Sequence, residues 1–538
     1  MDHKTLRLFT RAGFAMLVVF AAGADAPRPV PPDRKAYEKV INIKDPQEKI
    51  AALNAFLKQY PKSRRASDAW DAILNTLCEK MPDQSAEIRD TAKRYVDTEP
   101  VDERAYVEQD IADTLADHKM MLEDAEQYAQ KATTTTSENE FAKMVTEGRK
   151  KAGMRELNAE ELHRDYRKSQ AGFYATLGRV YVLENKNEQG RKLLEQALDD
   201  DPTIAEAAEA LGLLAMHEGQ NDKALSYLVR ARLNGELKPD SQKALETLYR
   251  GSHSGSLDGF EDYLDAEYEK VSPDPPPPAR YQPKAGQDRV VLAELFTGAA
   301  CSPCAGADTA MDQLMERFPR SEVAVLMYHV HVPEPDPIAN AGNVRRSSDY
   351  DIPGTPTLEV DGERVMAGGT RRDFKNAYDP YDAAIEKALA APAEAAIGLH
   401  ASRDAGLIRV NATVDHVNRD PKNLRLYVAL VEKKIRYSGQ NGIRFHPMAV
   451  RSLAGEDGGG FPIAPGERTA IDCGFDTAKL SSDLSKYLDD YEQYNDRFGP
   501  IKFIEKKSAI DPSDVAVVAF VQDTATKHVL QAAYADPQ

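Results

Sequence analysis

The chain has 538 residues, of which 42% are hydrophobic and 29% are charged, and its formal net charge is −18. This length and composition predict a soluble protein with several domains, each large enough for its own core. The negative charge argues against a nucleic-acid-binding protein, because such proteins neutralise phosphates with lysine and arginine.

Residues 1–26 have the pattern of a secretory signal peptide. A basic segment ending at Arg11 precedes an apolar run over 12–23, and small residues follow, so cleavage is expected before Asp25. The apolar run is short for a membrane span, but an uncleaved N-terminal anchor remains an alternative. Both interpretations predict an exported protein, either periplasmic or secreted.

Residues 35–250 are expected to be helical and repetitive. Leu177-Gly178 and Leu211-Gly212 occupy equivalent positions in two copies of one pattern, 34 residues apart. This period resembles a tetratricopeptide repeat, which implies a solenoid of stacked helix pairs. The residues that match in the first copy are Tyr174, Leu177, Gly178, Tyr181, Leu194, Ala197 and Pro202. The solenoid would bind a protein or peptide partner, or it would serve only as a spacer.

Residues 271–286 are rich in proline and predict a linker in the extended polyproline II conformation. Such a segment is a semi-rigid spacer, so a new domain is expected to begin near residue 287.

The domain expected over 287–391 contains the motif Cys301-Ser302-Pro303-Cys304. A short apolar run at 290–296 predicts a buried strand before it, and the apolar spacing over 311–318 predicts an amphipathic helix after it. The cysteines therefore lie where a strand ends and a helix begins. The free N–H groups of a helix start favour the thiolate, and the i, i+3 spacing allows a disulfide.

The rest of this domain contains further predicted secondary-structure elements in a defined order. A second apolar run at 323–330 precedes Thr355-Pro356, a hairpin is expected at Asp361-Gly362, and a helix is expected over 373–389. This order of elements resembles the thioredoxin superfamily, which implies an α/β thioredoxin-like fold with a cis bond before Pro356.

The resemblance also implies thiol–disulfide exchange. Cys301 would be the nucleophile and Cys304 the resolving cysteine, while Thr355 and Pro356 would bind the substrate backbone. No cofactor is expected.

Two positions depart from the family pattern. Thioredoxins usually have tryptophan before the first cysteine, where this chain has Ala300, and a buried acid six residues before it, where this chain has Leu295. Glu294 is one residue away and, by strand alternation, on the opposite face. Glu294 and His329 are nevertheless candidates for tuning the cysteine pair.

His329 and His331 lie on one face of the second predicted strand. Together with Cys301 and Cys304 they offer a copper-binding alternative, although the sequence does not favour a metal site. Cys78 and Cys473 are expected to be buried free thiols, with a structural bridge between them as the alternative.

Residues 393–538 are expected to form an all-β, immunoglobulin-like sandwich with a helical insertion near 480–494. Strand-like runs occur at 407–414, 424–431, 515–521 and 528–533. Its function would be interaction or stabilisation of the neighbouring domain.

The combined hypothesis is an exported thiol–disulfide oxidoreductase that acts on protein or peptide disulfides and depends on a redox partner protein. The competing hypothesis is a redox-silent scaffold whose helical repeats bind a partner. The sequence does not distinguish a reductase from an oxidase.

Overall fold

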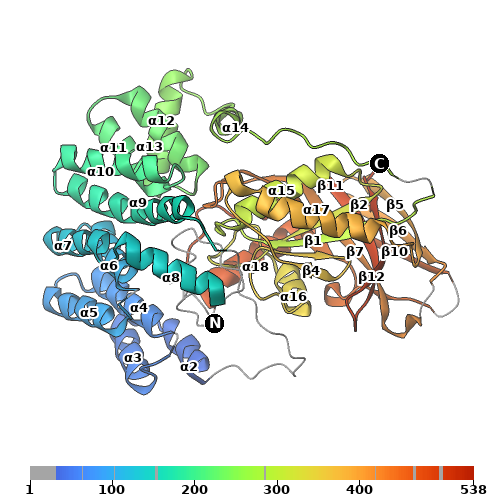
Figure 1. Cartoon of the computed structure of the whole chain (residues 1–538), viewed down its shortest axis with the longest axis horizontal. Helices are drawn as coiled ribbons and strands as arrows, with labels where there is room; N and C mark the ends of the chain where they lie inside the picture. The colour runs from blue at the N-terminus through green and yellow to red at the C-terminus, as the bar shows by residue number, and fades with distance from the viewer. Residues whose placement is uncertain are drawn as a thin grey trace. The chain divides into compact units, whose positions relative to one another are not determined.

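The computed structural model describes residues 32–63, 65–101, 103–151, 156–283, 286–417, 420–464, 468–495 and 501–538 (Figure 1). The signal peptide expected at 1–26 lies outside these residues. Two compact units make up the chain: unit 1 is Met1–Leu264 with Asp490–Ile504, and unit 2 is Asp265–Asp489 with Glu505–Gln538. None of the helices in the described residues is both long enough and apolar enough to cross a membrane.

The described residues of unit 1 form helices and no strand. In chain order these helices are α2 (Pro32–Ile41), α3 (Pro46–Gln59), α4 (Ala66–Lys80), α5 (Ser85–Thr98), α6 (Arg104–Asp117), α7 (Leu122–Thr134), α8 (Glu138–Lys151), α9 (Ala159–Leu183), α10 (Asn187–Asp200), α11 (Ala205–His217), α12 (Asn221–Leu233) and α13 (Pro239–Ser252). Helix α14 (Phe260–Val271) continues from unit 1 into unit 2. Successive helices pack as pairs, most extensively α6 with α7, α9 with α10 and α11 with α12.

The 34-residue repeat explains how two of these pairs pack. A Cβ atom on Gly178 of α9 would lie 2.8 Å from Leu194 Cγ of α10, and a Cβ atom on Gly212 of α11 would lie 2.7 Å from Leu228 Cγ of α12. Glycine thus lets the two helices of each pair approach closely, at equivalent positions of the two copies. The predicted helical repeat region is confirmed.

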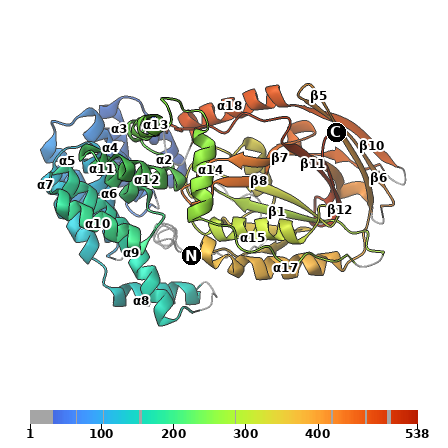
Figure 2. The ribbon, with the colours of Figure 1, turned by 90° about the horizontal axis from the view of Figure 1, so that it is seen from above.

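In unit 2, the segment around the cysteines folds as expected. Its elements are β1 (Val291–Thr297), α15 (Cys304–Arg317), β2 (Val323–His329), α16 (Ala341–Asp349), β3 (Thr357–Val360), β4 (Glu363–Val365), the 3₁₀ helix η1 (Arg371–Asp373) and α17 (Lys375–Leu389). Strand β1 pairs with β2 in parallel and with β3 antiparallel, and β3 and β4 form the expected hairpin. Helices α15 and α17 lie side by side on one face of the sheet (Figure 2). This is a thioredoxin-like fold.

The C-terminal segment supplies the remaining strands. They are β5 (Ala396–Asp404), β6 (Leu407–Asp415), β7 (Leu424–Arg436), β8 (Phe445–Leu453), β9 (Phe461–Pro462), β10 (Thr469–Asp476), β11 (Val515–Asp523) and β12 (Val529–Ala535). The predicted helical insertion is α18 (Thr477–Tyr494), and two 3₁₀ helices, η2 (Pro421–Asn423) and η3 (Glu456–Gly458), complete the segment. Strands β10, β6 and β5 form a small antiparallel sheet.

The other C-terminal strands extend the sheet that carries the cysteines. The order β12-β11-β7-β8-β2-β1-β3-β4 makes one sheet of nine strands among the described residues, with β9 paired to β7. The join is a parallel pairing of β2 with β8 at Met327 and Ala449. An apolar core that includes Val410, Val428 and Val517 fills the space between this sheet and the small one. The strands of 393–538 are therefore divided between the small antiparallel sheet and a larger mixed sheet that is continuous with the strands of 287–391.

Candidate functional site

Cys301 and Cys304 form a disulfide at the start of α15, with their Cα atoms 5.2 Å apart. A loop of three residues leads from β1 to Cys301, whose N–H donates to the carbonyl of Gly298 at 3.0 Å. Cys301 is 2% exposed and Cys304 is fully buried. The predicted position between strand and helix and the predicted disulfide are both confirmed.

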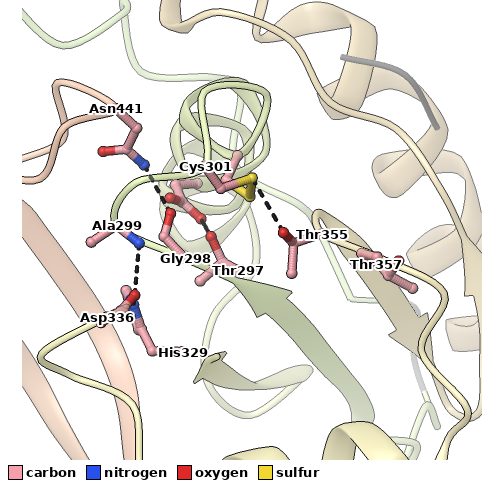
Figure 3. The surroundings of a disulfide bond; sticks show 12 residues. Thr297, Gly298, Ala299, Cys301, His329, Asp336, Thr355, Thr357 and Asn441 are labelled. Atoms are coloured by element: carbon pink, nitrogen blue, oxygen red, sulfur yellow. Dashed lines mark hydrogen bonds and ion pairs between the residues drawn. A yellow bond between two sulfur atoms is a disulfide. The ribbon is translucent and has the colours of Figure 1, made fainter. Parts of the chain in front are cut away.

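Thr355 and Pro356 lie beside this disulfide. Their peptide bond is cis, as the resemblance implied, and the Thr355 hydroxyl donates to Cys301 Sγ at 3.3 Å (Figure 3). A second cis bond, Val332–Pro333, was not predicted. The segment at Gly368 also touches the motif, because a Cβ atom there would lie 2.7 Å from the Pro303 carbonyl. The pair of glycines at 368–369 was the available sequence signal for this contact.

Glu294 faces away from α15. Its carboxylate accepts hydrogen bonds from Arg346 Nε and Nη2, both at 2.9 Å, and from the Tyr328 hydroxyl at 2.9 Å. Glu294 and Arg346 are 0% and 2% exposed, so they form a fully buried ion pair. These contacts connect Glu294 to the opposite face of the sheet, and its influence on the cysteines stays a prediction.

His329 reaches the cysteine loop through Asp336. His329 Nδ1 lies 2.9 Å from Asp336 Oδ2, and the same oxygen accepts from the N–H of Ala299 at 2.7 Å (Figure 3). Burial works to raise the pKa of the Asp336 carboxyl, but the charge and hydrogen bond of His329 and two backbone N–H groups lower it to about 2. Asp336 thereby fixes the loop that precedes Cys301.

The second histidine lies in a different contact. His331 Nε2 is 2.9 Å from the Tyr487 hydroxyl of α18, and burial lowers the pKa of His331 to about 4. Across the part of the chain that the structure describes, no group of three or more histidine, cysteine, aspartate or glutamate side chains is placed to hold a metal ion. The copper alternative therefore gains no support from the geometry.

Sequence reasoning missed Asp308, which lies on the first turns of α15. Its side chain is buried, and its Oδ1 accepts from the Thr297 hydroxyl at 2.7 Å. Burial raises the pKa of Asp308 to about 7, against the opposing charge of His329 and the hydrogen bond from Thr297. The sequence signal that could have identified Asp308 was its place four positions after Cys304, on the apolar face of the predicted helix.

Asn441, in the segment between β7 and β8, was also missed. Its N–H donates to the carbonyl of Ala299 at 3.0 Å, and its side-chain amide donates to the carbonyl of Gly298 at 3.3 Å (Figure 3). A Cβ atom on Gly439 would lie 2.5 Å from the Ala299 carbonyl, so this segment packs closely against the cysteine loop. The C-terminal region thus contributes directly to the site.

The other two cysteines are free thiols, as predicted, but only one of them has the predicted burial. Cys78 is buried on α4 and Cys473 is half-buried on β10. Burial raises the pKa of each thiol to about 11, so neither is a reactive thiolate near neutral pH.

Comparison with protein-family models finds no match, and comparison with curated proteins finds none either. Among solved structures, the chain is similar to HBP35 of Porphyromonas gingivalis, at 16% sequence identity over 47% of this chain and 77% of that chain, with a TM-score of 0.35. A TM-score this low carries no argument about fold or function. The fold assignment rests instead on the strand order of the sheet and on the geometry around the disulfide.

Proposed function

We propose that this protein is a thiol–disulfide oxidoreductase that acts on protein or peptide disulfides through Cys301 and Cys304. The observation that carries the proposal is the disulfide at the start of α15, with the Thr355 hydroxyl donating to Cys301 Sγ beside a cis Pro356. The thiolate of Cys301 would be stabilised by that hydroxyl and by the positive end of the α15 dipole.

The exchange runs in two steps. Cys301 thiolate attacks one sulfur of the substrate disulfide, the substrate S–S bond breaks, and the displaced sulfur leaves as a thiolate that takes up a proton. Cys304, once deprotonated, attacks Cys301 Sγ, and the second substrate sulfur leaves. Two electrons pass to the substrate and the Cys301–Cys304 disulfide forms. A redox partner protein restores the dithiol, or drives the reverse reaction if the protein is an oxidase.

We also propose assignments for the helical unit, for the C-terminal strands and for the location of the protein. The close-packed helix pairs at a 34-residue offset support a tetratricopeptide-like solenoid in unit 1, which would present a surface to a protein or peptide partner. The strand orders β12-β11-β7-β8 and β10-β6-β5 support an immunoglobulin-like sandwich. Export to the periplasm or secretion rests on the sequence of residues 1–26 alone.

One observation favours the competing hypothesis of a redox-silent scaffold. Cys301 is 2% exposed and Cys304 is fully buried, whereas a nucleophilic thiolate has to reach the substrate sulfur. Direct measurement of exchange separates the two hypotheses.

The test is the reduction potential of the pair, measured by glutathione titration with alkylation of free thiols, together with insulin reduction and dithiol oxidation assays. A potential near −270 mV would indicate a reductant and one near −120 mV an oxidant. Cys301→Ser and Cys304→Ser should abolish turnover, while Cys78→Ser and Cys473→Ser should retain it. Absence of exchange in the wild-type protein would leave the scaffold hypothesis.

A further inference from the structure

The second half-reaction requires a base that the sequence did not identify. Cys304 is fully buried, and burial disfavours the thiolate form of a cysteine. Its proton has to leave before Cys304 can attack Cys301. Leu295 occupies the position where the family pattern has a buried acid, so β1 offers no carboxylate to this face of the cysteine pair.

Asp308 is placed to receive this proton. Helix α15 begins at Cys304, and residues four positions apart lie on the same helix face. Cys304 is 0% exposed and Asp308 is 1% exposed, so both side chains are shielded from solvent. The hydrogen bond from Thr297, the last residue of β1, holds the Asp308 carboxyl at the end of the strand from which the cysteine loop departs.

One oxygen of the Asp308 carboxyl is available to accept a proton. Asp308 Oδ1 accepts from Thr297, whereas the buried Oδ2 has no hydrogen-bond partner among the described residues. A buried carboxylate oxygen without a partner is costly, and taking up a proton lowers that cost. His329 Nε2 is likewise buried without a partner in the described part of the chain. His329 is the register partner of Thr297, so its side chain projects from the same face of the sheet.

We propose that Asp308 is the proton acceptor and donor for Cys304 in the exchange reaction. When the mixed disulfide is resolved, the S–H bond of Cys304 breaks and its proton passes to the Asp308 carboxylate. Cys304 Sγ then bonds to Cys301 Sγ, and the substrate sulfur leaves with the electron pair of the broken bond. In the reverse direction, the protonated Asp308 returns the proton as Cys304 leaves as a thiolate. This inference rests on the proposed function and adds the group that handles its proton.

The charged and titratable groups around Asp308 come from several elements. They are His329 at the end of β2, Asp336 in the loop after that strand, Asp312 one turn further along α15, and Tyr381 on α17. The positive charge of His329 opposes the burial that raises the pKa of Asp308, and the result, about 7, permits proton exchange near neutral pH. Burial and the charge of Asp308 raise the pKa of Asp312 to about 8.

The experiment follows the two thiols separately in a Cys78→Ser/Cys473→Ser background. Reduced protein is mixed with 5,5′-dithiobis(2-nitrobenzoate): attack by Cys301 releases one thionitrobenzoate, and resolution by Cys304 releases the second. Asp308→Asn should leave the first release unchanged and slow the second about 10²-fold at pH 7. The defect should shrink as the pH is raised, because hydroxide then removes the proton of Cys304 in place of Asp308. Asp312→Asn, on the same helix, should resolve at the wild-type rate within about 2-fold.

A second variant tests the same idea without removing the carboxyl. Thr297→Val deletes the hydroxyl that bonds Asp308 Oδ1, so the pH midpoint of the second release should move upward. A second release in Asp308→Asn with wild-type rate and pH profile would overturn the proposal, as would an unmoved midpoint in Thr297→Val. Loss of both releases in Asp308→Asn would assign Asp308 a structural role and also overturn it. No second release in the wild-type background would instead contradict the proposed function.

Discussion

Replacing Arg346 with methionine should strongly destabilise unit 2. Arg346 makes two hydrogen bonds of 2.9 Å to Glu294, and the two side chains are 2% and 0% exposed. Methionine fills the space of the arginine stem but leaves the Glu294 carboxylate buried with only hydroxyl donors, from Tyr328 and Tyr350. Removing one partner of a buried ion pair costs about 3–5 kcal/mol. For a unit of this size that corresponds to a melting temperature lower by about 10 °C.

The double variant Glu294→Gln/Arg346→Met separates the ion pair from the shape of the side chains. It removes both charges, so it should recover most of the lost stability, because a neutral pair of similar volume needs no charge compensation. Tyrosines lie in both units, so near-ultraviolet circular dichroism follows unfolding of the whole chain, and the change due to unit 2 is the part that Trp70 fluorescence does not share. The single tryptophan, Trp70 on α4, lies in unit 1, so its fluorescence is an internal control that should not change.

One result would refute the stabilising role of the ion pair, and another would refute a purely structural role for Glu294. If Arg346→Met is as stable as the wild type, the ion pair does not stabilise the fold as its burial implies. If the double variant is stable but shifts the reduction potential of the cysteine pair, Glu294 tunes the site, as the sequence suggested, despite facing away from α15. Equal potentials in the double variant and the wild type would leave Glu294 a purely structural role.

Three further outcomes are expected from the geometry. Gly178→Ala places a Cβ atom 3.0 Å from a backbone carbonyl of the partner helix and should cost unit 1 about 1–3 kcal/mol in urea unfolding, whereas Gly251→Ala, with no atom within 4 Å, should not destabilise it. Gly439→Ala would meet the Ala299 carbonyl at 2.5 Å and displace the segment that covers the cysteine loop, so dithiothreitol should reduce the disulfide several-fold faster than in the wild type. The raised pKa of Asp308, about 7, means that between about pH 4 and 7 the folded oxidised protein holds a proton that the unfolded chain has lost, so this group contributes a fall in stability of about 1.4 kcal/mol per pH unit. Asp312, whose pKa burial raises to about 8, adds a slope of the same sign, so Asp308→Asn should make the slope in calorimetric scans shallower by about 1.4 kcal/mol per pH unit without abolishing it.

The sequence predicted those parts of the fold that local pattern determines. The spacing of Cys301 and Cys304 between an apolar run and an amphipathic helix placed the disulfide correctly, and Thr355-Pro356 predicted the cis bond. The 34-residue offset of Leu177 and Leu211 predicted helix pairs, because close packing needs glycine and leucine at fixed positions. In each of these cases, the interacting residues are close in the sequence or repeat at a regular interval.

What the sequence did not predict depends on long-range placement. The carboxyl of Asp336 reaches both His329 and the N–H of Ala299, and nothing in the local pattern around 336 indicates such a role. Asn441 lies 143 residues from Gly298 in the loop that it contacts, which is too far for periodicity to relate them. Asp308 was overlooked because an acid in the first turns of a helix is usually explained by the helix dipole and solvent exposure, and only burial makes it unusual.

The continuous sheet gives the C-terminal region a part in the chemistry as well as in the fold. If β8 did not pair with it, β2 would be an edge strand with unpaired backbone groups, which natural proteins cover or block. The same pairing places β8 and the segment before it beside the cysteine loop, where Asn441 binds Gly298 and Ala299. It also seats His446 of β8 against His329, with ring centroids 4.9 Å apart. The environment of the disulfide therefore includes side chains from beyond residue 393. Residues 287–391 by themselves would lack the contacts of Asn441 with the cysteine loop and the contact of His446 with His329, which lies near Asp308.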